Sequence, residues 1–406
     1  MSLLLQHGNI NTMNGIHYEC GDILIEQGKI KEIASHIAVS EMYHPKHIDA
    51  NVWDISGYTV LPGIIEAHCH IGITEERKGI EGDDCNESTN PVTPYLRGLD
   101  AINPLDAAFS KAVKAGITSV MAGPGSSNVV GGQFVFMKTA GSRKIDDLVI
   151  LQPAAMKAAF GENPKTLYGG KNSMPCSRMG IAAMLREELS HAQEYWQKTK
   201  HAHLLGISSS VPYDFRLACW IPVFEKEIPM KCHVHRADDI FTALRIAKEF
   251  DLDITLDHCT EGHLIADEIK ASGFPAIVGP DFTSRNKIET ENMAFKTAGI
   301  LSKAGVPIAV TTDHPVSLIQ SLPLCAGLAA KNGLGMEEGL KAITINAAKI
   351  CRVEHRVGSL AVGKDADIAI FDGNPMNLFT HCVGTIIDGK IVYRNERTHT
   401  APTRIL

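Results

Sequence analysis

The chain has 406 residues, a formal net charge of −7 at pH 7 and a hydrophobic fraction of 44%. At about 150 residues per domain this length predicts two to three domains, and the acidic balance argues against binding to nucleic acid or to an anionic membrane surface. No run approaches the roughly 20 apolar residues of a membrane span, and the first residues lack the basic and apolar regions of a signal peptide. We therefore expect a cytoplasmic protein. Its ten cysteines are scattered singly, which favours free thiols.

Both ends of the chain have the short alternating pattern of β-strands. Near the start, the apolar run 22–26 meets the turn Gln27-Gly28, which is a hairpin signal. Near the far end, the segments 366–371 and 385–392 have the same character. Because chain termini commonly lie close together, we expect residues 1–58 and 353–406 to form one small β domain.

The middle of the chain, residues 59–352, alternates between short apolar strands and helical segments. Such alternation is typical of parallel strands joined by crossover helices, and about 290 residues of it predict one (β/α)8 barrel. A doubly wound sheet is the alternative, but no GxGxxG phosphate turn supports it. Strands are expected at 64–67, 117–121, 153–160, 230–233, 254–258, 274–278 and 307–312, and helices at 105–115, 178–200, 215–227, 240–250 and 291–304.

The strongest local signal for chemistry is the triplet His68-Cys69-His70 at the end of the first predicted barrel strand. Positions i and i+2 of a strand share a face, so both imidazoles point the same way and Cys69 points away. Two hydrogen-bonded polar residues at a strand end would give the same pattern. The triplet alone therefore leaves a metal site and a purely structural role open.

Three other predicted strands also end in residues that bind metals: His233, His258 and Asp313. The C-terminal ends of all strands of a barrel meet at one mouth, where catalytic residues collect. Together with the first pair, these residues make a nitrogen and oxygen donor set that suits Zn²⁺ or a similar divalent ion. The sequence thus predicts one metal-binding site: His68, His70, His233, His258 and Asp313.

With these residues the sequence resembles the amidohydrolase superfamily. The first-strand motif of that family is similar to Pro62-Gly63-Ile64-Ile65-Glu66-Ala67-His68-Cys69-His70, with glutamate here at the position of the usual aspartate. The segments 344–349 and 358–368 also resemble the closing signature of the family. The resemblance covers almost the full length and is closest to the imidazolonepropionase-like group, which includes dipeptidases of the prolidase kind. It implies a TIM barrel with a small β-sandwich domain formed by both termini.

Lys157 lies in the fourth predicted barrel strand, where family members with two metals carry a carbamylated lysine. An unmodified ammonium group beside two divalent cations would be repelled, whereas a carbamate offers two anionic oxygens. We therefore expect Lys157 to be carbamylated and to bridge two ions. A lysine that snorkels out of the barrel rim or contacts substrate is the alternative. Glu162, five residues further on, is the rival carboxylate ligand.

Candidates for substrate contact are His235, Arg236 and His314, each next to a predicted ligand. His235 shares a strand face with His233 if the strand continues, and is the alternative ligand there. Similarity to the fifth strand of the family favours His233.

The leading hypothesis is a metal-dependent enzyme that hydrolyses a C–N bond in an amide, cyclic amide or dipeptide-like small molecule. One or two zinc ions would activate water, with Asp313 as general base and then general acid. A deaminase of the same superfamily is the alternative. Those enzymes resemble one another in carrying a glutamate a few residues beyond the fifth-strand histidine, and the segment 233–239 has no glutamate. Imidazolonepropionases have a comparable acidic residue, so its absence also disfavours that exact activity. A third hypothesis is a catalytically inactive metal-binding scaffold. A homo-oligomer is left open.

Overall fold

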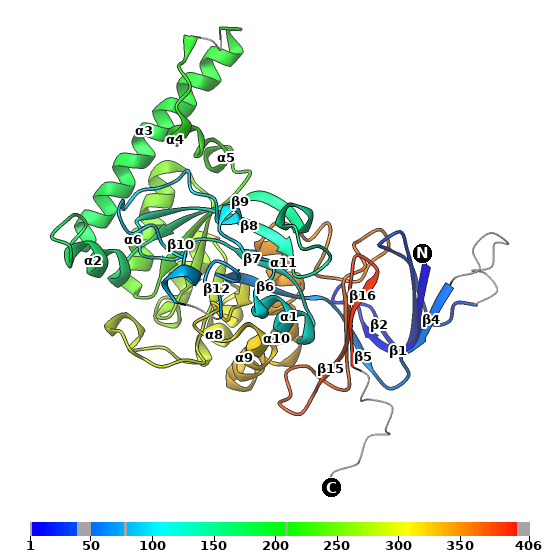
Figure 1. Ribbon diagram of the computed structural model, residues 1–406. Helices are drawn as coiled ribbons and strands as arrows, with labels where there is room; N and C mark the ends of the chain where they lie inside the picture. The colour runs from blue at the N-terminus through cyan, green and yellow to red at the C-terminus, as the bar shows by residue number, and fades with distance from the viewer. Residues whose placement is uncertain (1, 39–49, 77–78, 208–209, 396–406) are drawn as a thin grey trace.

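The computed structural model describes residues 2–38, 50–76, 79–207 and 210–395, which form two eight-stranded sheets (Figure 1). One sheet combines strands from both ends of the chain, and we call it the terminal sheet. The other curves into a nearly closed barrel at the centre of the α/β body, and we call it the barrel sheet. Residues 1, 39–49 and 396–406, which the sequence assigned to the terminal β domain, lie outside the described residues.

The terminal sheet joins the two ends of the chain through the antiparallel pairing of β5 with β14, in which Val60 lies opposite Ile370. Apolar side chains from both ends, including Leu5, Ile10 and Ile368, pack in one buried cluster. β5 lies just beyond residue 58, so this sheet includes four residues that the sequence assigned to the barrel. A β-sandwich remains a prediction. The strands are β1 (Ser2–Asn11), β2 (His17–Glu26), β3 (Lys29–Ala34), β4 (Ala50–Asp54), β5 (Thr59–Pro62), β14 (Ile368–Phe371), β15 (Cys382–Ile387) and β16 (Lys390–Arg394).

The barrel sheet contains eight strands in sequence order from β6 to β13. Its two end strands are tied together where they reach the mouth, because the Thr311 hydroxyl donates to the His68 carbonyl at 2.6 Å and the His70 amide donates to the His314 carbonyl at 2.8 Å. The strands are β6 (Ile64–Cys69), β7 (Ile117–Ala122), β8 (Val130–Lys138), β9 (Val149–Ala159), β10 (Met230–Val234), β11 (Ile254–His258), β12 (Ala276–Val278) and β13 (Ile308–Val310).

The third barrel strand departs from the predicted (β/α)8 pattern. β8 pairs antiparallel with both β7 and β9, whereas the other described pairs of the barrel sheet are parallel. Only residues 123–129 connect β7 to β8, and a parallel crossover needs a dozen residues or more. The connection therefore closes as a hairpin without a helix. The fold is TIM-like, but its sheet is mixed, and the expectation of eight parallel strands was wrong at β8.

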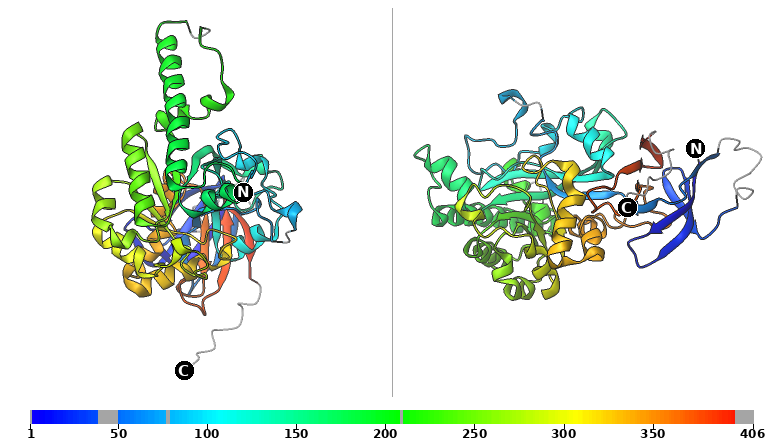
Figure 2. Two further views of the ribbon diagram at one scale, coloured as in Figure 1. Left: turned by 90° about the vertical axis from the view of Figure 1, so that its left-hand side faces the viewer. Right: turned by 90° about the horizontal axis from the view of Figure 1, so that it is seen from below.

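Helices surround the barrel, and α3 extends well beyond it as a long arm (Figures 1 and 2). The predicted helix at 215–227 is two single turns, α4 and α5, because Pro222 fits the first turn of a new helix but would break a continuous one. No helix in the described ranges is long and apolar enough to cross a membrane. The helices are α1 (Ala107–Lys114), α2 (Glu162–Gly169), α3 (Arg178–Leu204), α4 (Phe215–Ala218), α5 (Ile221–Phe224), α6 (Ala237–Phe250), α7 (Ala266–Ser272), α8 (Lys296–Ala304), α9 (Leu322–Ala329), α10 (Met336–Ala342) and α11 (Ile345–Ile350).

A buried ion cluster connects the two sheets. Lys138, the last residue of β8, has a side chain that is only 4% exposed, and its Nζ lies 3.0 Å from Asp365 Oδ2, 2.5 Å from Asp367 Oδ2 and 3.3 Å from Asp388 Oδ1. Two of these carboxylates are as buried as the lysine, and they lie directly before β14. The cluster therefore fixes how the C-terminal strands dock on the barrel.

Replacing Lys138 is expected to destabilise the fold. Lys138→Met removes the cation that pairs with buried Asp367, while Lys29 and Arg356 still pair with Asp365. Removing one partner of a buried ion pair typically costs about 3 kcal/mol or more of unfolding free energy. Chemical denaturation measures this loss directly. Lys144→Met, which removes an equally charged but 68% exposed side chain, should change the free energy of unfolding by less than about 0.5 kcal/mol. Equal stability of the two variants would contradict a structural role for the cluster.

Candidate metal centre

The first pair of predicted ligands lies at the barrel mouth, where β6 ends. His68 is in β6 and His70 directly follows it, and alternation places both on the same face as Glu66. The Nδ1 atom of His70 lies 2.7 Å from the Gly123 carbonyl oxygen, and that of His68 lies 3.1 Å from Asp257 Oδ2. Both Nε2 atoms lie on the side of Asp313.

Asp313 and His258 reach the same point from the ends of β13 and β11, and β13 is the strand tied to β6. Their backbone φ angles are +50° and +71°, in the left-handed region that non-glycine residues seldom adopt and that recurs at functional sites. Asp313 Oδ1 lies 3.2 Å from His70 Nε2 and 3.5 Å from His68 Nε2. His258 is oriented by the Gly279 carbonyl, 2.8 Å from its Nδ1. The ligand atoms of His68, His258 and Asp313 all lie within 4.8 Å of one another.

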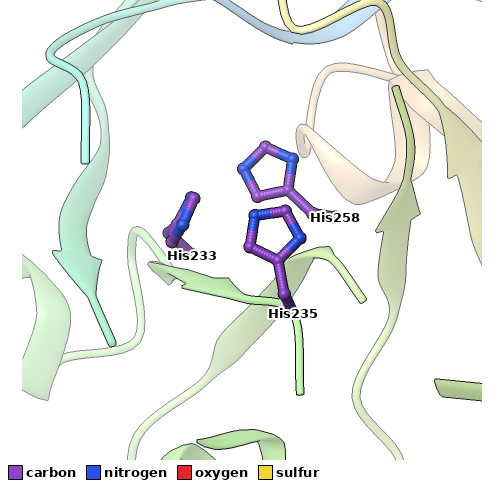
Figure 3. Close-up of side chains that lie close together, drawn as sticks. All are labelled: His233, His235 and His258. Carbon is purple, nitrogen blue, oxygen red and sulfur yellow. The ribbon is translucent and has the colours of Figure 1, made fainter. Parts of the chain in front are cut away.

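A second group of imidazoles adjoins this point (Figure 3). His233 in β10 and His235 just after it share a strand face, with ring centroids 4.7 Å apart. His258 stands between the groups, with its ring centroid 4.5 Å from that of His233 and stacked on that of His235 at 4.9 Å. Each of the three residues offers a ligand atom within 4.8 Å of the others. The structure thus brings together both alternatives for the fifth-strand ligand.

Lys157 in β9 points toward His68 inside the barrel. Its side chain is fully buried, and Nζ lies 3.2 Å from His68 Nε2 and 4.0 Å from Asp257 Oδ2. Nζ also lies 5.5 Å from the ring centroid of Phe134. Burial lowers the pKa of Lys157 from 10.5 to about 8, because the charged form loses its hydration. A large share of the amine is therefore neutral at slightly alkaline pH.

The imidazoles of the site differ in their electrostatic surroundings. Burial opposes the charge on His70, yet the Cys85 thiol and Asp313 raise the pKa of this imidazole to about 10. Burial lowers the pKa of His68, His233, His235 and His258, which keeps these four rings neutral with a free lone pair.

The residues present fit a divalent metal ion. Imidazole ligands characteristically donate their second N–H to an oxygen of the protein, as the Nδ1 contacts of His70 and His258 do. Asp313 Oδ1 is buried and has no hydrogen-bond partner among the described residues, although it faces two imidazole Nε2 atoms. A bound ion would satisfy that oxygen and both nitrogens together.

Comparison with known proteins agrees with this geometry. A model of the amidohydrolase family matches residues 225–393. Imidazolonepropionase of Brevibacillus brevis is 51% identical to the chain over 394 residues, covering 87% of this chain and 84% of that protein. The chain belongs to the amidohydrolase family. The structure of an amidohydrolase from Thermotoga maritima MSB8 is similar to this amidohydrolase with a TM-score of 0.91 and 36% sequence identity, covering 97% of this chain and 100% of that one.

A further relative is larger than this amidohydrolase. Amidohydrolase tasK of Hapsidospora irregularis is 27% identical over 400 residues, which is 91% of this chain but only 39% of tasK. The chain therefore spans well under half of that relative.

Three other predicted site residues have different surroundings in the amidohydrolase. The Glu162 carboxylate accepts from the Glu289 amide at 3.4 Å instead of facing the imidazoles. Arg236 is about one-third exposed and forms two hydrogen bonds to Asp238, at 2.9 and 3.2 Å. His314 is fully buried, and its Nδ1 accepts from the Ile319 amide at 3.2 Å.

Sequence reasoning did not find Asp257 and Glu289. Asp257 is fully buried and lies 3.2 Å from Lys231 Nζ as well as against His68. Alternation should direct it away from the mouth, but the left-handed turn at His258 lets both neighbours point inward. An aspartate inside a buried apolar strand was the signal available. Glu289, on the 3-10 turn η7 (Ile288–Thr290), offered no signal because it lies in a connecting segment rich in charged and polar residues.

Proposed function

We propose that this amidohydrolase binds one or two divalent ions, with zinc as the expected metal, and hydrolyses a C–N bond in an amide, cyclic amide or dipeptide-like small molecule. The convergence of His68, His70, His233, His258 and Asp313 at one barrel mouth supports this proposal most strongly. In this proposal His68 and His70 hold one ion, and His233 and His258 hold the other.

Asp313 is the proposed general base and acid. When bound, a zinc ion would lower the pKa of a water molecule and polarise the scissile carbonyl. Burial opposes ionisation of Asp313, but His258, His70 and His68 hold its pKa well below the usual range. The carboxylate is therefore ionised at neutral pH, which is the form that accepts a proton from the attacking water. The same oxygen then returns the proton to the leaving nitrogen.

Lys157 is the proposed bridging ligand in its carbamylated form. The ammonium group first loses a proton, the neutral amine adds to CO2, and the resulting carbamic acid releases a second proton, so that a cationic side chain becomes an anionic one. The burial of Lys157 and its 3.2 Å approach to His68 Nε2 support this proposal. We further propose that Arg236 and His314 contact the substrate.

Removal of metal is expected to abolish activity. Protein stripped with a chelator should lose at least about 10³-fold in kcat on a panel of dipeptides, N-acyl amino acids and cyclic amides, since no activated water remains. Addition of Zn²⁺ should restore turnover, and zinc content measured on the same sample should follow it. Ammonia release from a heterocyclic amine, with no amide cleavage, would contradict the proposal and favour deamination. Zinc binding without turnover across the panel would favour a scaffold.

A further inference from the structure

Glu289 is a buried carboxylate that has no part in the proposed mechanism. It lies on η7, in the connection between β12 and α8, and is only 1% exposed. Its Oε1 atom has no hydrogen-bond partner among the described residues. A buried carboxylate oxygen is costly to leave unsatisfied, so we expect this atom to bind a hydrogen-bond donor or a cation.

The oxygen faces the second histidine pair. Glu289 Oε1 lies 3.9 Å from His233 Nε2 and 3.8 Å from His235 Nε2. The donor atoms of one tetrahedral ion with bonds of about 2.1 Å lie roughly 3.4 Å apart. Both distances from the carboxylate oxygen are thus slightly longer than a bound ion requires. His235 Nδ1 lies 2.7 Å from Thr260 Oγ1, which directs its Nε2 toward the carboxylate.

The carboxylate is held in place by the neighbouring loop. Its other oxygen, Oε2, accepts from the Glu162 amide at 2.8 Å, and the Glu162 carboxylate accepts in return from the Glu289 amide. A Cβ at Gly161 would lie only 2.6 Å from Glu289 Oε2, so this close approach requires glycine, which also has a φ of +80°. Glu289 is therefore anchored by one oxygen and presents the other to the imidazoles.

One competing cation lies nearby. Lys287 Nζ is 3.6 Å from Glu289 Oε1, but it donates its hydrogen bond to Asn163 Oδ1 at 2.5 Å. Its side chain is 34% exposed, so it can move into solvent. Lys287 thus lies close enough to Glu289 to compete with a bound ion, while its hydrogen bond goes to Asn163.

We propose that His233, His235 and Glu289 form a ligand set for a second divalent ion, beside the set of His68, His70 and Asp313, with His258 between the two. In this arrangement His235 and Glu289 are metal ligands, and the second ion has an anionic ligand whether or not Lys157 is carbamylated. Each of the two ions is then held by one His-x-His pair and one carboxylate. The inference rests on the proposed metal dependence for its chemistry, but its test measures bound zinc.

Zinc titration of stripped full-length protein against a competing chelator tests this set. Unmodified protein should bind two Zn²⁺ ions per chain. Glu289→Gln and His235→Asn should each weaken binding of the second ion at least about 10-fold, because each removes one ligand. The affinity for the first ion should be unchanged. Lys287→Met should tighten binding of the second ion, because it removes the competing cation. Glu291→Gln is the matched control, the same change two residues away on an exposed side chain.

The outcomes separate this inference from the proposed function. Two ions bound with unchanged affinity in both Glu289→Gln and His235→Asn would overturn the ligand set and leave metal-dependent hydrolysis intact. A changed KM with unchanged zinc binding in Glu289→Gln would also overturn it, in favour of a substrate contact. No zinc binding by unmodified protein would overturn both. If Glu289→Gln fails to fold by circular dichroism, His235→Asn alone decides.

Discussion

Asp313→Asn is expected to lower kcat by about 10³-fold or more, the largest effect of any single substitution at the site. General acid–base catalysis typically contributes 10²–10⁴-fold, and the asparagine amide neither accepts the proton nor offers the anionic oxygen that faces His68 and His70 at 3.5 and 3.2 Å. Steady-state kinetics on the best substrate of the panel measures the loss. Zinc titration of the same variant should show weaker binding of the first ion.

The matched control is Asp146→Asn, which makes the same chemical change at a side chain that is 63% exposed. It should retain the kcat of unmodified protein within a factor of two. Retention of more than a tenth of kcat by Asp313→Asn would contradict both roles that we assign to Asp313.

Lys157→Ala is expected to eliminate a carbamate signal and to lower kcat by at least about 10²-fold, since positioning of the ions is lost together with the bridge. In unmodified protein supplied with ¹³C-bicarbonate, a carbamate resonance should appear in the ¹³C spectrum. Because the pKa of Lys157 is lowered to about 8, the neutral amine increases as pH rises through 8, and carbamate occupancy should increase with it. Short carboxylic acids should partly restore activity to the variant by filling the vacated space.

Lys165→Ala, at an exposed position of α2, is the control and should keep both the resonance and the activity. Absence of the resonance from fully zinc-loaded protein at pH 8 would refute the carbamate. The centre would then hold its ions without a bridge from β9.

Much of the barrel was predictable because buried strands are short apolar runs and their C-terminal ends meet at one mouth. The same rule placed His68, His258 and Asp313 together without any knowledge of the loops. No strand was predicted at β8 because Gly131 and Gly132 weaken the strand signal at its start. Its direction depends on the length of a connection, which hydrophobic periodicity does not report.

The rest of the site depends on backbone paths that local patterns do not encode. Glu289 approaches His233 and His235 only because η7 is anchored against the turn at Gly161 and Glu162. Glu162, a plausible ligand from its position in the chain, is used to hold that turn. In both cases tertiary contacts between loops decide which carboxylate faces the imidazoles.

The pairing of β5 with β14 has a consequence for how the chain is made. The two strands are separated by about 300 residues, so at a synthesis rate of roughly 5–20 residues per second the edge of β5 has no partner strand for about 15–60 seconds. An uncovered strand edge is a template for pairing with other chains. The nascent chain is therefore vulnerable to aggregation through β5 until β14 has been made and pairs with it.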